Sequence, residues 1–124
     1  MNGVKVRFLN RDKILIRLKA LARQLLASRP DILEVSLFGS LVRGTHGPGS
    51  DADVFVLLKS DPRKISDRIP EFLRHFSGVG IPVEVFPYTV EEVALMGEGG
   101  FIRTIQREKM VMEEREGIEN RGYV

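Results

Sequence analysis

Three kinds of hydrophobic pattern follow one another along the first half of the chain. Apolar residues recur at helical spacing over Arg11–Ser28, and the preceding Asn10 is a favourable N-cap, so this stretch predicts an amphipathic helix that ends before Pro30. Two-residue alternation over Leu33–Phe38 predicts a strand. The run Val54–Leu58 is almost continuously apolar, which is typical of a central strand covered on both faces.

The second half of the chain predicts further helices and strands. A proline at its first helical position and another at Pro70 predict a broken or kinked helix over Pro62–Phe76. Alternation predicts a third strand over Ile81–Phe86. The run Thr-Val-Glu-Glu matches a capping box and predicts a helix over Thr89–Met96. A last helix is then expected to lead into a short strand over Met110–Met112.

The two ends of the chain depart from this pattern. Val4–Phe8 alternates apolar and basic residues, which predicts a short, half-exposed strand. Residues 113–124 are charged with scattered apolar residues, so we expect a flexible tail. Residues 1–112 are therefore expected to form a single α/β domain, with an N-terminal strand and helix over 1–31. A small mixed β-sheet flanked by helices is expected over 32–112.

Composition narrows the class of protein. The chain has 124 residues, 43% of them hydrophobic, which is enough for one domain with an ordinary core. A net charge of only +2 argues against direct nucleic-acid binding. The absence of cysteine excludes disulfides, thiolate catalysis and cysteine-based zinc sites. Because no apolar run approaches the ~20 residues of a membrane span and no signal peptide is recognisable, we expect a cytoplasmic protein without membrane contact.

Candidate chemistry gathers around two aspartates. Asp51 and Asp53 stand two positions apart at the start of the apolar strand, so their side chains share one face. Such like charges raise each other's pKa unless a cation lies between them, and carboxylate oxygens suit Mg²⁺ or Mn²⁺ bound together with substrate phosphates. The break at Gly39-Ser40 upstream would let the backbone approach those phosphates closely.

These residues resemble the signature of a known family. Gly39-Ser40, then Arg43-Gly44, then Ser50-Asp51-x-Asp53 before an apolar strand are similar to the motif of the DNA polymerase β-like nucleotidyltransferases. The resemblance is strongest to the minimal nucleotidyltransferases (MNT), which pair with HEPN-domain proteins. It extends over residues 32–112 and implies the nucleotidyltransferase fold.

The resemblance implies roles for three carboxylates. Asp51, Asp53 and Glu84 would be the catalytic residues and the ligands of Mg²⁺ or Mn²⁺, with ATP as the substrate. Glu84 would also take the proton from the attacking hydroxyl, although the family more often has the shorter Asp at this place. The plainer alternatives are an aspartate pair that caps a turn and an exposed glutamate on an edge strand.

A second group of residues is implied to bind the nucleotide. Ser40 and the backbone at Gly39 would contact a β- or γ-phosphate. Arg43 would pair with a phosphate through its planar guanidinium, or would form a surface ion pair instead. Ser50 would order the loop by bonding to nearby backbone. His46 in the same loop is interpreted as an exposed residue without a role.

The implied reaction transfers AMP from ATP to a hydroxyl and releases pyrophosphate. A chain of 124 residues is expected to leave little room for a second domain that would hold the acceptor. The resemblance therefore implies that a HEPN-type toxin is both partner and acceptor, and that the chain acts as its antitoxin. The surfaces expected to bind it are Arg11–Ser28 and Glu91–Glu113, and a homodimer is an option for the isolated chain.

Two other functions remain open. A nucleotide-sugar glycosyltransferase also uses Asp-x-Asp with Mn²⁺, although such folds need considerably more chain. A non-catalytic antitoxin would keep the fold and block its partner by direct binding.

Overall fold

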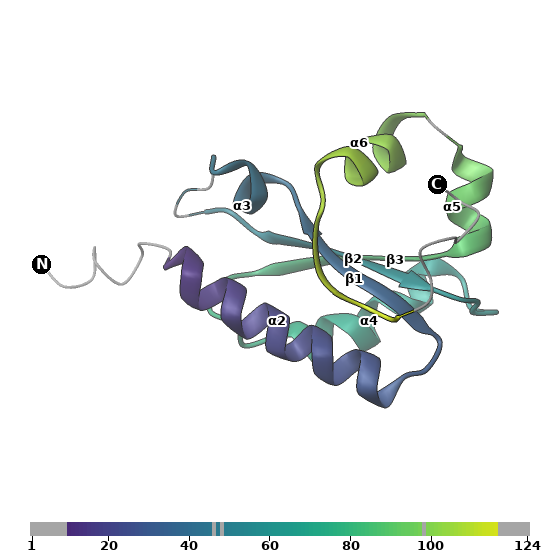
Figure 1. Cartoon of the computed structure of the whole chain (residues 1–124), viewed down its shortest axis with the longest axis horizontal. Helices are drawn as coiled ribbons and strands as arrows, with labels where there is room; N and C mark the ends of the chain where they lie inside the picture. Colours follow the sequence, from purple (N-terminus) through teal and green to yellow (C-terminus); the bar gives the residue numbers. More distant parts are fainter. Residues whose placement is uncertain (1–9, 46, 48, 98, 117–124) are drawn as a thin grey trace, which may run out of the picture.

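The computed structural model describes residues 10–45, 47, 49–97 and 99–116. Its helices and strands follow in the order α2 (Arg11–Ser28), β1 (Ile32–Phe38), α3 (Ser40–Arg43), β2 (Ala52–Leu58), α4 (Ile65–Phe76), β3 (Val83–Thr89), α5 (Val90–Met96), α6 (Gly100–Glu108) and β4 (Met110–Glu114). The four strands form one sheet in the order β3-β2-β1-β4, in which β2 and β3 are parallel and the other pairs antiparallel. Helices α2 and α4 cover one face, and α5 and α6 lie on the other (Figure 1).

The face under α2 and α4 holds the larger apolar cluster. The helical spacing of α2 directs its buried residues to the sheet, and the side chain of Asn10 caps the helix by accepting from the backbone N of Lys13 at 3.1 Å. From α4, Phe72 and Phe76 are completely buried against the same cluster. Burial of each such side chain stabilises the fold by about 1.5–3 kcal/mol.

The opposite face holds a smaller cluster that includes Phe55 of β2, Val93 of α5 and Ile105 of α6. This cluster covers only part of the face, because Asp53 and Glu84 occupy the start of β2 and β3 on the same side. One end of this face is therefore apolar and covered, and the other is acidic.

The helix predicted to begin at Pro62 begins at Ile65 instead. The carboxylate of Asp61 accepts from the backbone N of Arg63 at 2.9 Å and also pairs with its guanidinium, which holds the chain in a turn before the helix. A broken or kinked helix was predicted, and the break does not occur, because α4 continues through Pro70. Pro70 stands on the exposed side, where water can satisfy the carbonyl that lacks its helical partner.

The third strand begins and ends later than Ile81–Phe86, because its parallel pairing with β2 continues as far as Leu58 opposite Thr89. β3 is an edge strand, and proline, which has no backbone N–H to donate, is tolerated in edge strands, so Pro87 does not disrupt the centre of the sheet. The capping box at Thr89 is present as predicted.

The last strand, expected over Met110–Met112, continues to Glu114. Arg115 then donates to the backbone oxygens of Leu26, Arg29 and Ile32. The flexible tail that was expected from residue 113 therefore does not begin there, since pairing with β1 fixes these residues.

Three expectations concern positions outside the described residues: the strand over Val4–Phe8, the exposure of His46 and the end of the tail after residue 116. Among the helices that the structure does describe, none has the length and apolar character needed to cross a membrane.

Candidate active site

Parallel pairing of β2 with β3 places Asp53 directly opposite Glu84. Both side chains lie on the sheet face that carries Phe38, the partner of Asp53 on β1. Partial burial and the negative charges of Glu84 and Asp51 raise the pKa of Asp53 to about 6, and the positive charge of Arg43 opposes this only in part. The site thus holds two carboxylates whose repulsion a cation would relieve.

Gly39 lies against this pair at the end of β1. Its φ is +83°, a left-handed conformation that side chains disfavour, and an added Cβ would stand 2.2 Å from Oδ2 of Asp53. Only glycine therefore allows the backbone to approach the Asp53 carboxylate this closely. The short helix α3 follows at once and ends at Arg43, where Gly44, whose φ is +79°, caps it.

Glu108, at the end of α6, is a residue of the site that the sequence analysis missed. Its Oε1 accepts from the backbone N of Gly39 at 2.9 Å and from Nη1 of Arg43 at 3.0 Å. Arg43 thus forms the ion pair that was the alternative to phosphate binding. Glu108 is more than sixty residues from either donor in sequence, so no local motif could have indicated the contact.

The remaining expected residues lie nearby. Asp51 stands one position before β2, half-buried, and is close enough to contribute to the raised pKa of Asp53. Ser40 is the first residue of α3. Ser50 accepts from the backbone N of Gly47 at 2.8 Å and so closes the loop on itself, which is the local ordering expected of it.

The carboxylates fit a divalent metal in charge and donor type, and Gly39 leaves the space beside them free of a side chain. Of the three expected metal ligands, Asp53 and Glu84 stand directly opposite each other in the register of β2 and β3. Within residues 10–116, apart from the three masked positions, no group of three or more His, Asp or Glu side chains is already arranged to hold a metal ion.

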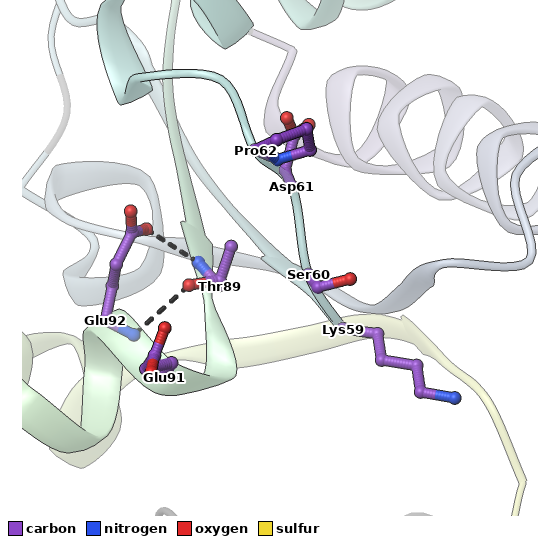
Figure 2. Close-up of a pocket in the computed structure, with 7 residues that line it drawn as sticks. All are labelled: Lys59, Ser60, Asp61, Pro62, Thr89, Glu91 and Glu92. Atoms are coloured by element: carbon purple, nitrogen blue, oxygen red, sulfur yellow. Dashed lines mark hydrogen bonds between the residues drawn. The ribbon is translucent and has the colours of Figure 1, made fainter.

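A second polar centre lies at the opposite end of the same strands. An open pocket of about 340 Å³ is lined by seven residues that follow β2 or begin α5: Lys59, Ser60, Asp61, Pro62, Thr89, Glu91 and Glu92 (Figure 2). Lys59, the first of these residues, lies six positions after Asp53, a distance of about 20 Å along a strand. Because its carboxylates outnumber its one lysine, this pocket is a poor place for a triphosphate.

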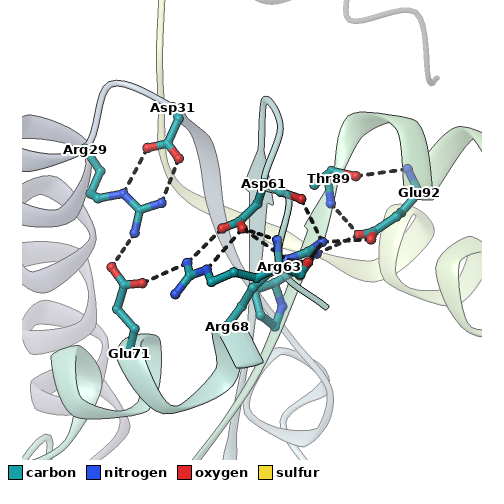
Figure 3. A network of polar contacts seen from close by, with 9 residues as sticks. Arg29, Asp31, Asp61, Arg63, Arg68, Glu71, Thr89 and Glu92 are labelled. Carbon is teal, nitrogen blue, oxygen red and sulfur yellow. Dashed lines mark hydrogen bonds and ion pairs between the residues drawn. The ribbon is translucent and has the colours of Figure 1, made fainter. Parts of the chain in front are cut away.

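The charged residues beside that pocket stabilise the fold. Arg68 is 2% exposed and donates to both carboxylate oxygens of Glu92, at 2.7 and 2.9 Å, and to the carbonyl of Pro87. Arg63 pairs with Asp61 and lowers the pKa of that carboxyl to about 2. Figure 3 shows how these pairs join the turn before α4 to β3 and α5. Each of these arginines is paired with a carboxylate, as is typical of a polar network that stabilises a fold.

Three comparisons with known proteins bear on this arrangement. The family model described as nucleotidyltransferase domain matches residues 17–116. A CCA-adding enzyme from Pyrobaculum neutrophilum is 42% identical over 50 residues, which are 40% of this chain but only 12% of that enzyme. The chain therefore spans a small part of this curated relative.

Two solved structures share the fold. A protein described as a nucleotidyltransferase from Sulfolobus solfataricus superposes with a TM-score of 0.65 at 21% identity, covering 94% of this chain and 91% of that one. The toxin-antitoxin MntA-HpeT superposes with a TM-score of 0.52 at 17% identity, covering 87% of this chain and 75% of that one. At such identities these likenesses establish the fold alone.

The expected fold class, a mixed sheet flanked by helices in the polymerase β-like arrangement, is confirmed. The family model extends from α2 to beyond β4 and so includes the strands that carry the carboxylates. The chain belongs to the nucleotidyltransferase domain family.

Proposed function

We propose that the protein transfers AMP from ATP to a hydroxyl group and releases pyrophosphate. The observation that carries this proposal is the pairing of Asp53 with Glu84 across two parallel strands, beside a glycine that lies against the Asp53 carboxylate. A carboxyl pKa that is raised by partial burial and by neighbouring negative charges, as at Asp53, is typical of carboxylates that work with a cation or a proton. No comparable pair faces the pocket at the other end of the strands, where each of Asp61 and Glu92 has an arginine partner.

The residues divide the reaction between them. Asp51, Asp53 and Glu84 would hold Mg²⁺ or Mn²⁺, which when bound supplies positive charge to the transferring phosphoryl group. The acceptor oxygen forms a bond to the α-phosphorus while the bond from that phosphorus to the bridging oxygen breaks. Glu84, exposed at the edge of the sheet, takes the proton of the acceptor hydroxyl.

The phosphate chain is assigned to the end of β1. The backbone N of Gly39, the hydroxyl of Ser40 and the guanidinium of Arg43 are donors within one short segment, and Ser50 shapes the loop that returns to Asp51. Charge-assisted hydrogen bonds from these donors would orient the triphosphate so that its α-phosphorus faces the carboxylates.

We further propose that the acceptor is a Tyr or Ser hydroxyl of a HEPN-type toxin, and that the modification silences it in the cytoplasm. Support comes from the MNT resemblance and from the fold shared with the antitoxin complex MntA-HpeT. The expected partner surfaces carry exposed apolar side chains: Ile16 on α2, and Leu95, Met96 and Phe101 around the junction of α5 and α6. Exposed apolar groups of this kind are typical of surfaces that another protein covers.

Incubation of the chain with the protein encoded beside it, α-labelled ATP and Mg²⁺, followed by intact-mass spectrometry of that protein, tests the proposal. A gain of one or more AMP units, absent with Asp53→Asn, is the expected result. No gain with any HEPN-type partner would reject AMP transfer.

One observation favours a second function, a non-catalytic antitoxin. The Gly39 N–H and the Arg43 guanidinium are already satisfied by Glu108, as in a protein that does not use these donors for phosphate. Inhibition of the partner that persists in the double variant Asp51→Asn, Asp53→Asn would support this function over AMP transfer.

A further inference from the structure

Glu108 holds two donors that the proposed function assigns to the phosphate chain. One carboxylate oxygen accepts from both the Gly39 backbone and the Arg43 guanidinium. A phosphate oxygen is the same kind of acceptor for such donors, since both are anionic and both form charge-assisted hydrogen bonds. The single N–H of Gly39 cannot donate fully to both ligands at once.

We propose that Glu108 is an internal competitor of the nucleotide: its carboxylate occupies the phosphate-binding donors of the free protein and must leave them when a triphosphate binds. The inference rests on the proposed function for the kind of ligand, and it concerns the regulation of that same site. Any partner that draws Glu108 away would then increase the affinity for nucleotide.

The position of Glu108 follows from the packing of α6. The ring of Phe101 contacts those of Phe38 and Phe86, with centroids 5.7 and 5.2 Å apart, and Ile105 is completely buried. Phe101, Ile105 and Glu108 stand at positions i, i+4 and i+7 of α6, about two turns of helix, so all three lie on one side of it, and Glu108 contacts the backbone N of Gly39 at the end of β1. The carboxylate is thus presented to Gly39 by a packed helix and not by a loose segment.

The contact can be exchanged without moving the helix. The side chain of Glu108 is 21% exposed and that of Arg43 is 51% exposed, so water reaches the pair. The next residue, Lys109, is held separately by Glu34 at 2.6 Å. Glu108 can therefore turn its side chain into solvent while α6 remains in place.

Competition of this kind has a modest but measurable size. An exposed ion pair such as Glu108–Arg43 changes a binding constant by about 1.5- to 5-fold, and the hydrogen bond from the Gly39 N–H to Glu108 adds to this. We expect removal of the contact to tighten triphosphate binding about 2- to 10-fold.

The test compares Glu108→Ala and Glu108→Asp with the wild type, using calorimetric titration with inorganic tripolyphosphate in the presence of Mg²⁺. Glu108→Asp keeps the charge but shortens the reach by about 1.5 Å, so it separates direct occupation from long-range repulsion. Glu91→Gln is the control, since it removes an exposed carboxylate at the far end of the sheet. Thermal melts monitor folding of all variants.

Both Glu108 variants are expected to bind tripolyphosphate about 2- to 10-fold more tightly, and the control to bind as the wild type does. If Glu108→Asp bound tripolyphosphate as the wild type does, the charge of residue 108 alone would explain any change in affinity, and the inference would be overturned. Weaker binding by both variants would overturn it too, because Glu108 would then position Gly39 and Arg43 for the ligand. So would the absence of tripolyphosphate binding in every protein.

Failure of the proposed function has a different signature. Tighter binding by both Glu108 variants together with no AMP transfer would sustain the competitor and reject the transferase. AMP transfer without any change of tripolyphosphate affinity in the Glu108 variants would support the transferase and reject Glu108 as a competitor.

Discussion

Asp53→Asn is expected to stabilise the metal-free protein at neutral pH while it abolishes nucleotide transfer. In the folded chain the Asp53 carboxylate is partly buried and faces the negative charges of Glu84 and Asp51. In the unfolded chain it is solvated, Glu84 is far away in sequence, and the charge of Asp51, two residues away, is screened by water. Folding therefore disfavours its ionised form, and an amide of the same shape removes this cost.

The raised pKa sets the size of the effect. The pKa of Asp53 rises from an ordinary 3.8 to about 6. At about 1.36 kcal/mol for each pKa unit, this gives an upper limit of about 3 kcal/mol at pH 7.5. Because the side chain remains partly exposed, solvent screening reduces the expected gain to about 1–2 kcal/mol.

The sign of the pH dependence follows from linkage. A carboxyl whose pKa is raised on folding binds its proton more tightly in the folded state, so its stabilising contribution is present below pH 3.8 and is lost as the pH rises through about 6. The advantage of Asp53→Asn over wild type should accordingly be near zero at pH 4 and complete at pH 7.5.

Chemical denaturation of both proteins in EDTA at pH 4, 5, 6 and 7.5 measures this difference. Glu116→Gln, which removes an exposed carboxylate near the end of the described chain, is the control for net charge. In a Glu84→Gln background the gain from Asp53→Asn should shrink, because one of the two repelling charges is already absent. Mg²⁺ should stabilise the wild type but not Asp53→Asn.

A gain in stability that is equal at pH 4 and pH 7.5 would refute the reasoning, since it would not depend on ionisation. A loss of stability at pH 7.5 would refute it as well, because the carboxylate would then be making favourable contacts in the metal-free fold.

Three further predictions concern residues around the site and the structural network. Glu84→Gln should lower the rate of AMP transfer by about 10²–10⁴-fold with little change in ATP affinity; turnover assays and binding calorimetry that showed equal, small losses in rate and affinity would mean that Glu84 has no catalytic role. Gly39→Ala should abolish transfer and destabilise the fold by about 1–3 kcal/mol in denaturant titrations, because the added methyl meets Asp53 at a left-handed φ; unchanged stability would contradict the packing described here. Glu92→Gln should destabilise the protein by about 1–2 kcal/mol, since it removes the charge of the carboxylate that binds both terminal nitrogens of the buried Arg68 and leaves only Asp61, 3.9 Å away, as its ion-pair partner; an effect under about 0.5 kcal/mol would show that the Arg68–Glu92 pair contributes little to stability.

Local patterns determined most of the secondary structure. The cap at Asn10, the capping box at Thr89 and the apolar periods of α2 and β2 act over a few residues, and the structure contains them where they were predicted. The spacing of Gly39 and Asp53 likewise indicated a shared site, because both lie at adjoining ends of paired strands.

Boundaries were less predictable, because tertiary contacts set them. Helix α4 starts at Ile65 and not at Pro62, because the carboxylate of Asp61 accepts hydrogen bonds from Arg63 and holds the chain in a turn. β3 continued past Phe86, and β4 past Met112, because each could keep pairing with its neighbour in the sheet. A propensity read over a short window contains no information about how long a partner strand will be.

The sequence by itself determined which residues could form helices, strands and a tight backbone turn, since these depend on side chains a few positions apart. Only the tertiary structure decided that Asp53 faces Glu84, because a parallel pair needs the whole α4 crossover to set its register. It also decided that Glu108 lies on Gly39. Ion pairs between distant segments depend on how helices pack, and no spacing along the chain encodes that distance.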